Sequence, residues 1–148
     1  MKLKRILAVL FALILVFSIP MKCAAEDEKD SSHVILIDAG HGGIDGGAKS
    51  KQGTVEKDIN LSIALKLKEA LSQSGYKVYL TREEDTQLDK KKVNDLAARC
   101  KMKKDTNCDI FISIHQNMFP QAKCFGAQVW YASNDDSKVL AEEVQSSL

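Results

Sequence analysis

Segments of strand length alternate with segments of helical periodicity from residue 33 to the end of the chain. Short apolar runs predict strands at 33–37, 76–80, 109–114 and 127–131. Apolar residues at helical spacing predict helices that begin near 57, 90 and 135, the first ending before the glycine at 75. Because the connections are short, the alternation predicts an α/β fold, a three-layer sandwich with helices on both faces of a largely parallel, twisted sheet.

The second of these helices is distinguished by many lysines. Its lysines are expected to form a solvated face rather than a binding patch. Its expected apolar side consists of Val93, Leu96, Ala97, Cys100 and, at its end, Met102.

The composition fits one globular domain and excludes two classes of protein. The chain has 148 residues, of which 45% are apolar and 28% charged, so neither several domains nor a disordered chain is expected. The net charge of +1 is unevenly distributed, because four cations precede Glu26 and every acidic residue lies at or after it. The chain from Glu26 onward is slightly acidic. It lacks the basic face that binding of nucleic acid requires, so a nucleic-acid partner is not expected.

The first 25 residues have the pattern of an export signal. Lys2, Lys4 and Arg5 precede an apolar run over 6–19, and cleavage is expected near Ala25. The run has 14 residues, whereas a bilayer crossing takes about 20, so a cleaved signal peptide is favoured over a permanent anchor. Residues 26–32 then form a charged spacer, and residues 33–148 form the folded domain.

The cysteines suggest no chemistry. Cys23 is preceded by Lys22, where a lipidation signal needs a small residue, so acylation is not expected. Cys100, Cys108 and Cys124 are spaced by eight and sixteen residues, which fits no metal knuckle. Three ordinary cysteines are favoured, and one disulfide with one free thiol is the alternative.

Two unusual loops follow predicted strands. Residues 38–47 include five glycines, and residues 115–117 follow the third strand. The carboxyl ends of parallel strands meet at one edge of a sheet, where ligands bind in open α/β folds. We therefore expect the two loops to lie close together.

These loops and the start of the first helix supply three candidate metal ligands, His41, Glu56 and His115. Two histidines and a carboxylate suit a catalytic Zn²⁺, which keeps a fourth position for a water whose pKa falls to about 7. The spacing of these residues leaves an alternative open, in which the histidines are structural and the glutamate only interacts favourably with the helix dipole.

The sequence resembles the zinc-dependent N-acetylmuramoyl-L-alanine amidases of the amidase_3 type, most closely their spore-cortex, germination-specific branch. The resemblance covers nearly all of the chain after the leader, in the family's order, and rests on residues 34–48, 55–61, 81–82, 112–117 and 126–128. It implies that His41, Glu56 and His115 are the zinc ligands. It also implies that residues 33–148 are the amidase catalytic domain.

The implied reaction is hydrolysis of the amide between N-acetylmuramic acid and L-alanine in peptidoglycan, a step towards muramic-δ-lactam in spore cortex. Zinc would polarise the carbonyl and supply the nucleophile. Asn117 is expected to contact substrate or the surroundings of the ligands. Asp38 or Asp45 is expected to orient the loop or a ligand histidine, and turn chemistry around the glycines is the alternative.

The resemblance also implies a location and partners. We expect export to the cell wall or the forespore intermembrane space, a regulatory or lipoprotein partner, and functional coupling to a peptidoglycan deacetylase. The family's general acid/base glutamate has no counterpart before Leu148, so the domain is expected to be incomplete at its carboxyl end and this chain to be weakly active or inactive. The alternatives are a non-catalytic or partner-dependent metal- or wall-binding protein, and a zinc peptidase of stem peptides.

Overall fold

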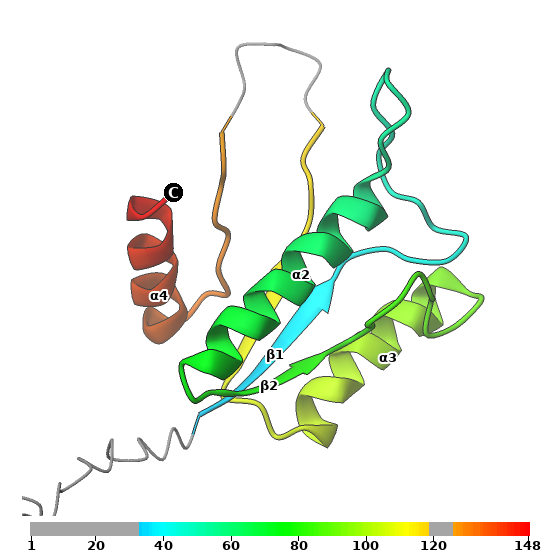
Figure 1. Ribbon diagram of the computed structural model, residues 1–148. Helices are drawn as coiled ribbons and strands as arrows, with labels where there is room; N and C mark the ends of the chain where they lie inside the picture. The colour runs from blue at the N-terminus through cyan, green and yellow to red at the C-terminus, as the bar shows by residue number, and fades with distance from the viewer. Residues whose placement is uncertain (1–32, 119–125) are drawn as a thin grey trace, which may run out of the picture.

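The computed structural model describes residues 33–118 and 126–148. The expected signal peptide and spacer, together with Cys23 and Cys124, lie outside the described residues. The elements follow in the order β1 (Val34–Ala39), α2 (Glu56–Gln73), β2 (Lys77–Leu80), α3 (Lys92–Asp105), β3 (Ile110–Ile114) and α4 (Asp135–Ser146). The strands form one parallel sheet in the order β2-β1-β3 (Figure 1).

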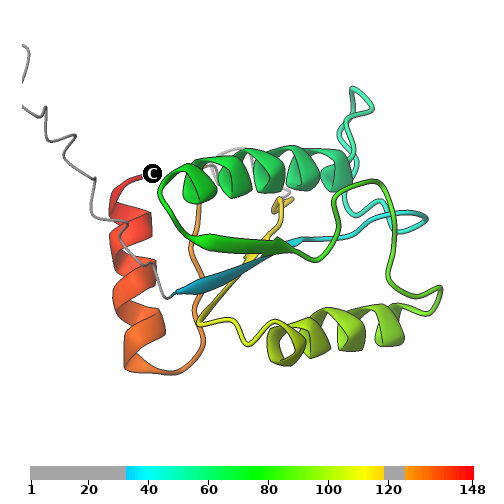
Figure 2. The same cartoon turned by 60° about the horizontal axis from the view of Figure 1, so that its bottom comes forward.

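The sheet lies between two helices. Helix α2 packs on one face, against β1 and β2, and α3 covers the other face (Figure 2). Helix α4 lies to one side of these layers. The prediction of a three-layer α/β sandwich with a parallel sheet is confirmed. Within the described ranges, no helix combines the length and the apolar character that crossing a membrane requires.

The core is centred on β1. Ile35, Leu36 and Ile37 are buried, as expected for the middle strand of a parallel sheet that is covered on both faces. Ala64 of α2 joins Ile35 and Ile37 in one buried cluster. The uninterrupted apolar run at 34–37 therefore fixes the strand around which the other elements assemble.

The expected apolar side of α3 is largely wrong, because Met102 is the one residue of it that is partly buried. Val93 is 79% exposed and Leu96 is 52% exposed, whereas Arg99 of the same helix is buried. The guanidinium of Arg99 donates to Asp38 of β1 and to the backbone beyond it, so α3 is attached to the sheet by a polar contact. Helical periodicity of apolar residues cannot indicate such a contact.

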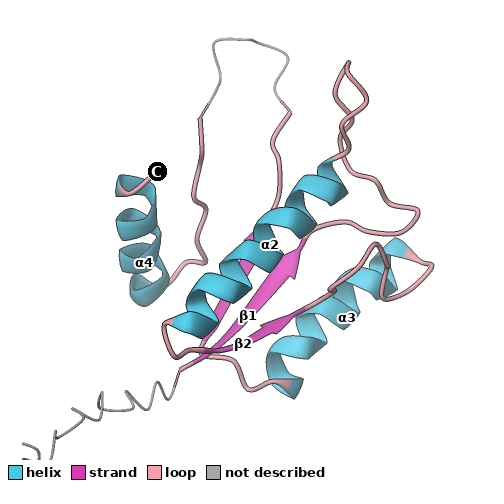
Figure 3. Ribbon diagram, viewed as in Figure 1, coloured by secondary structure: helices cyan, strands magenta, loops and turns pink. Residues whose placement is uncertain are grey.

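The expected strand at 127–131 is also absent from the sheet, and the segment is drawn as loop in Figure 3. Its backbone groups bond to a side chain of α4: the N–H of Val129 donates to Gln145 Oε1 at 2.9 Å, and Gln145 Nε2 donates to the carbonyl of Ala127 at 3.3 Å. These bonds use groups that a strand would present to its neighbour. The expected third helix is confirmed as α4, which is capped by the side chain of Asn134.

Candidate metal centre

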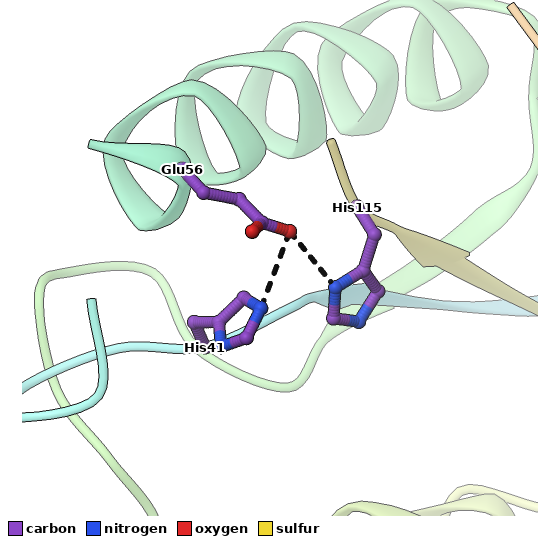
Figure 4. A group of neighbouring side chains, drawn as sticks. All are labelled: His41, Glu56 and His115. Atoms are coloured by element: carbon purple, nitrogen blue, oxygen red, sulfur yellow. Dashed lines mark hydrogen bonds and ion pairs between the residues drawn. The ribbon is translucent and has the colours of Figure 1, made fainter. Parts of the chain in front are cut away.

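Three side chains from three segments converge at the carboxyl edge of the sheet (Figure 4). His41 follows β1, Glu56 is the first residue of α2, and His115 follows β3. Glu56 Oε1 lies 3.2 Å from His41 Nε2 and 3.1 Å from His115 Nδ1. One ligand atom from each of the three lies within 4.8 Å of the others. The structure thus brings together the three residues singled out from the sequence.

The strand register explains why the two histidines meet. Strands β1 and β3 are parallel, and Ala39 is paired with Ile114, so both strands end at the same level. The N–H of Gly40 donates to the carbonyl of Ile114 at 3.1 Å and extends the pairing by one residue. His41 and His115 therefore leave the sheet side by side, as the prediction of converging loops requires.

Two glycines allow the ligands to approach the backbone this closely. A Cβ atom at Gly40 would lie 2.4 Å from the ring of His115. A Cβ atom at Gly47 would lie 2.6 Å from Glu56 Oε2 and 2.7 Å from the ring of His41. The glycines of this loop thus make room for the ligand side chains, in addition to allowing the chain to turn.

His41 is held in an unusual backbone conformation. Its φ angle of 63° lies in the left-handed region, which costs a residue with a Cβ atom about 1–3 kcal/mol. Asp45 Oδ2 lies 3.0 Å from His41 Nδ1 on the ring side opposite Glu56. A proton held on Nδ1 by this carboxylate leaves the lone pair of Nε2 facing the centre. Asp45 is therefore placed to orient this histidine, and its Oδ1 also accepts from the N–H of Gly47 at 3.3 Å, which is the turn chemistry that the sequence left open.

Glu56 is a buried carboxylate, 6% exposed, with several donors. The backbone N–H of Ala48 donates to Oε2 at 2.8 Å and that of Gln116 to Oε1 at 2.9 Å. Burial raises the pKa of Glu56, but these two hydrogen bonds and the one with His115 outweigh it and lower the pKa to about 2. At neutral pH the residue is an anionic ligand.

The low pKa of Glu56 predicts that acid destabilises the folded protein. Because its folded pKa is about 2 and its ordinary value is 4.5, its contribution is complete above about pH 5 and is lost as the pH falls towards 2. We expect a loss of about 3 kcal/mol from the free energy of unfolding of the metal-free protein. Urea unfolding of the wild type and of Glu56→Gln at several pH values measures it.

The difference in stability between those two proteins should shrink as the pH falls from 5 to 2. Glu69→Gln, on an exposed turn of the same helix, is the matched control and should follow the wild-type profile. Parallel profiles for wild type and Glu56→Gln would show that the hydrogen bonds to Glu56 do not stabilise its ionised form.

The described hydrogen bonds of the Asp38 and Asn117 side chains go to residues other than the three ligands. Asp38 is buried in β1 and accepts hydrogen bonds from Thr81, Arg99 and Ser113, at 2.7 to 2.8 Å, so it ties the segments beneath the loop together. Asn117 is exposed, and its Nδ2 donates to Gln128 Oε1 at 3.1 Å. Its contact with substrate stays a prediction.

Sequence reasoning missed the residues that support the ligands. Asn60, fully buried in α2, donates to the carbonyl of Gly40 at 3.1 Å and accepts from Gln116 Nε2 at 3.1 Å. Arg82 and Arg99 are buried beneath the loop. Arg82 and Thr81 directly follow a strand in the sequence, and that position was the signal available for them.

The donor set fits a catalytic zinc ion. Two imidazole nitrogens and an ionised carboxylate are a ligand set of zinc hydrolases, which leave one position free. The side chain of His115 is 48% exposed, so the centre is open to solvent on that side. An α/β domain with an open His₂Glu set at its strand ends is typical of the metal-dependent hydrolases.

The comparison with protein families narrows this class. The family model for N-acetylmuramoyl-L-alanine amidase, Amidase_3, matches residues 35–148. The chain therefore belongs to this family, and the resemblance drawn from its motifs is confirmed.

Relatives and solved structures agree with this assignment. The chain is 35% identical over 127 residues to the germination-specific N-acetylmuramoyl-L-alanine amidase of Bacillus subtilis (strain 168), an alignment that covers 80% of this chain and 53% of that protein. The CwlD amidase from Clostridioides difficile, solved in complex with the GerS lipoprotein, is similar with a TM-score of 0.63 and 42% identity over 77% of this chain and 66% of that one. The catalytic domain of CwlV from Bacillus (Paenibacillus) polymyxa var. colistinus is similar with a TM-score of 0.64 and 35% identity, over 74% of this chain and 59% of that one. The chain thus spans about half the length of the Bacillus subtilis relative.

Proposed function

We propose that the protein hydrolyses the amide bond between N-acetylmuramic acid and L-alanine in peptidoglycan, with zinc held by His41, Glu56 and His115. The observation that carries the proposal is the convergence of these three residues within a domain of the amidase family. We further propose spore cortex as the substrate and a step towards muramic-δ-lactam as the role. The similarity to a germination-specific amidase supports that choice.

Each residue of the centre has a separate task in this proposal. When bound, zinc supplies a Lewis acid and a bound water with a pKa of about 7. Glu56 contributes a negative charge, because the hydrogen bonds that its buried carboxylate accepts keep it ionised. Asp45 keeps Nε2 of His41 turned towards the centre. The centre is open to solvent beside the half-exposed His115, and the glycan-linked peptide enters from that side. Asn117, at the same edge, is proposed to contact that peptide.

Location and partners complete the proposal. Residues 1–25 direct export, and the protein acts in the cell wall or the forespore intermembrane space. A regulatory or lipoprotein partner is proposed because the similar Clostridioides difficile amidase was solved in complex with a lipoprotein. Coupling to a peptidoglycan deacetylase follows from the lactam product, which needs both reactions.

Mass spectrometry of digested cortex peptidoglycan tests the reaction. The leaderless protein is incubated with zinc, and His115→Ala is the control. Release of stem peptides that begin with L-alanine by the wild type alone is the expected result. Cleavage within the stem peptide would identify a zinc peptidase instead. Silence from the wild type would favour a non-catalytic or partner-dependent binding protein.

A further inference from the structure

We propose that Arg82 and Arg99 are positioning residues that assemble the metal centre before any metal binds. They would do so by fixing the backbone from which His41 projects. The inference rests on the proposed function only in taking His41 as a metal ligand.

The two guanidinium groups share the carbonyls of three successive residues, 39–41. Arg82 Nε donates to the carbonyl of Ala39 at 2.8 Å, and its Nη2 donates to that of Gly40 at 3.1 Å. Arg99 Nη1 also donates to the carbonyl of Ala39, at 2.9 Å, and its Nη2 donates to that of His41 at 2.8 Å. Each arginine is 4% exposed. The chain immediately before and at the ligand is therefore held from two sides.

This arrangement meets a need created by the end of β1. Buried carbonyl groups require donors, and the pairing of β1 with β2 ends at Ile37, before the three carbonyls that the arginines serve. A guanidinium carries five N–H donors in a rigid fork, so it can serve several carbonyls at fixed relative positions. Lysine has one terminal nitrogen and cannot reproduce that geometry.

Both arginines are themselves firmly held. Arg99 bonds to Asp38 and to Asp95, each at 2.7 Å, and so links β1 with α3. Arg82 donates to the carbonyl of Lys57, in the first turn of α2, at 2.8 Å. The loop is thereby connected to the sheet, to α3 and to the helix that carries Glu56.

A buried charge network of this kind is better explained by geometry than by stability. Replacing buried ion pairs with apolar residues often leaves stability unchanged or raises it, so such pairs are weak evidence of a stabilising role. Here the network ends on the carbonyl of His41, whose left-handed φ of 63° the chain would otherwise tend to leave. Loss of the fork should let His41 relax and separate Nε2 from the other ligands.

The test uses Arg99→Lys and Arg82→Lys, which keep the charge and lose the fork. Lys101→Met, at an exposed position of α3, is the matched control. Zinc dissociation constants are measured by competition with a chelator, the absorption spectrum of the Co²⁺-loaded protein reports ligand geometry, and urea unfolding of the metal-free protein reports stability. We expect both lysine variants to raise the zinc dissociation constant about 10- to 100-fold and to alter the Co²⁺ spectrum, and Lys101→Met to do neither.

Wild-type affinity and an unchanged Co²⁺ spectrum in variants that are only less stable would overturn the proposal and leave the arginines a structural role. A wild type that binds no zinc would instead contradict the proposed function. Hydrogen exchange on the wild type tests the inference without any variant. The amides of Gly40 and Gly42, bonded to Ile114 and Asp45, should be protected in metal-free protein. Protection that arises only after zinc is added would refute assembly before binding.

Discussion

Alanine in place of His41 or of His115 should remove stoichiometric zinc from the purified protein, whereas His33→Ala should retain it. Each of the first two variants deletes one of three ligands, so zinc affinity should fall by more than about a hundredfold, the upper range for residues that only support ligands. His33 precedes β1, at the opposite end of the strand from the centre, and its ring lies 3.8 Å from Asp109. Elemental analysis and titration calorimetry measure the outcome.

His33→Ala serves as the matched control because it removes the same side chain from the same domain. Equal zinc content in all three variants would disprove the ligand assignment. Glu56→Gln should retain part of the affinity, since an amide oxygen still coordinates but brings no charge.

Gly42→Ala should cause the largest loss of stability of any single methyl added to the glycine-rich loop. A Cβ atom at Gly42 would lie 2.1 Å from the backbone carbonyl oxygen of Thr86, and the φ angle of 135° is one that side chains rarely adopt. Crowding against backbone and conformational strain together should lower the free energy of unfolding by about 3 kcal/mol or more. Urea unfolding of the metal-free protein measures the loss.

Gly53→Ala separates the two causes. Gly53 also has a positive φ, of 94°, but a Cβ atom there would meet nothing within 4 Å. Gly53→Ala should lower the free energy of unfolding by about 1–2 kcal/mol, from the backbone conformation alone. Equal losses of stability in the two variants would show that crowding against Thr86 is not what requires glycine at position 42.

The sequence predicted the layers of the fold because they depend on local patterns. The apolar run at 34–37, with glycines after it and segments of helical periodicity further on, is typical of a strand in a sheet that is covered on both faces. The packing of α3 could not be predicted in this way. Its contacts with the sheet include an ion pair between Arg99 and a residue 61 positions earlier, Asp38, and the ammonium of Lys103 over the ring of Phe111. No periodicity marks either contact. The segment at 127–131 alternates like a strand, yet its backbone bonds to Gln145 instead of to a neighbouring strand.

The candidate site divides in the same way. His41, Glu56 and His115 were singled out because their residue types suit zinc and strand ends meet at one edge. Asn60 and Arg82 lie in segments that carry the resemblance, but neither they nor Arg99 were given a role, because residue type alone does not show that an amide or a guanidinium bonds to backbone carbonyls. Asp45 was one of two candidates, and only the position of its carboxylate beside Nδ1 distinguished it.

Anomalous diffraction at the zinc edge shows whether His41, Glu56 and His115 hold a zinc ion. Crystals of the leaderless protein grown with zinc should show one anomalous peak about 2.0–2.2 Å from His41 Nε2, His115 Nδ1 and a Glu56 oxygen. A peak held by other residues, or crystals that contain no ordered zinc, would show that these three side chains are not a zinc centre.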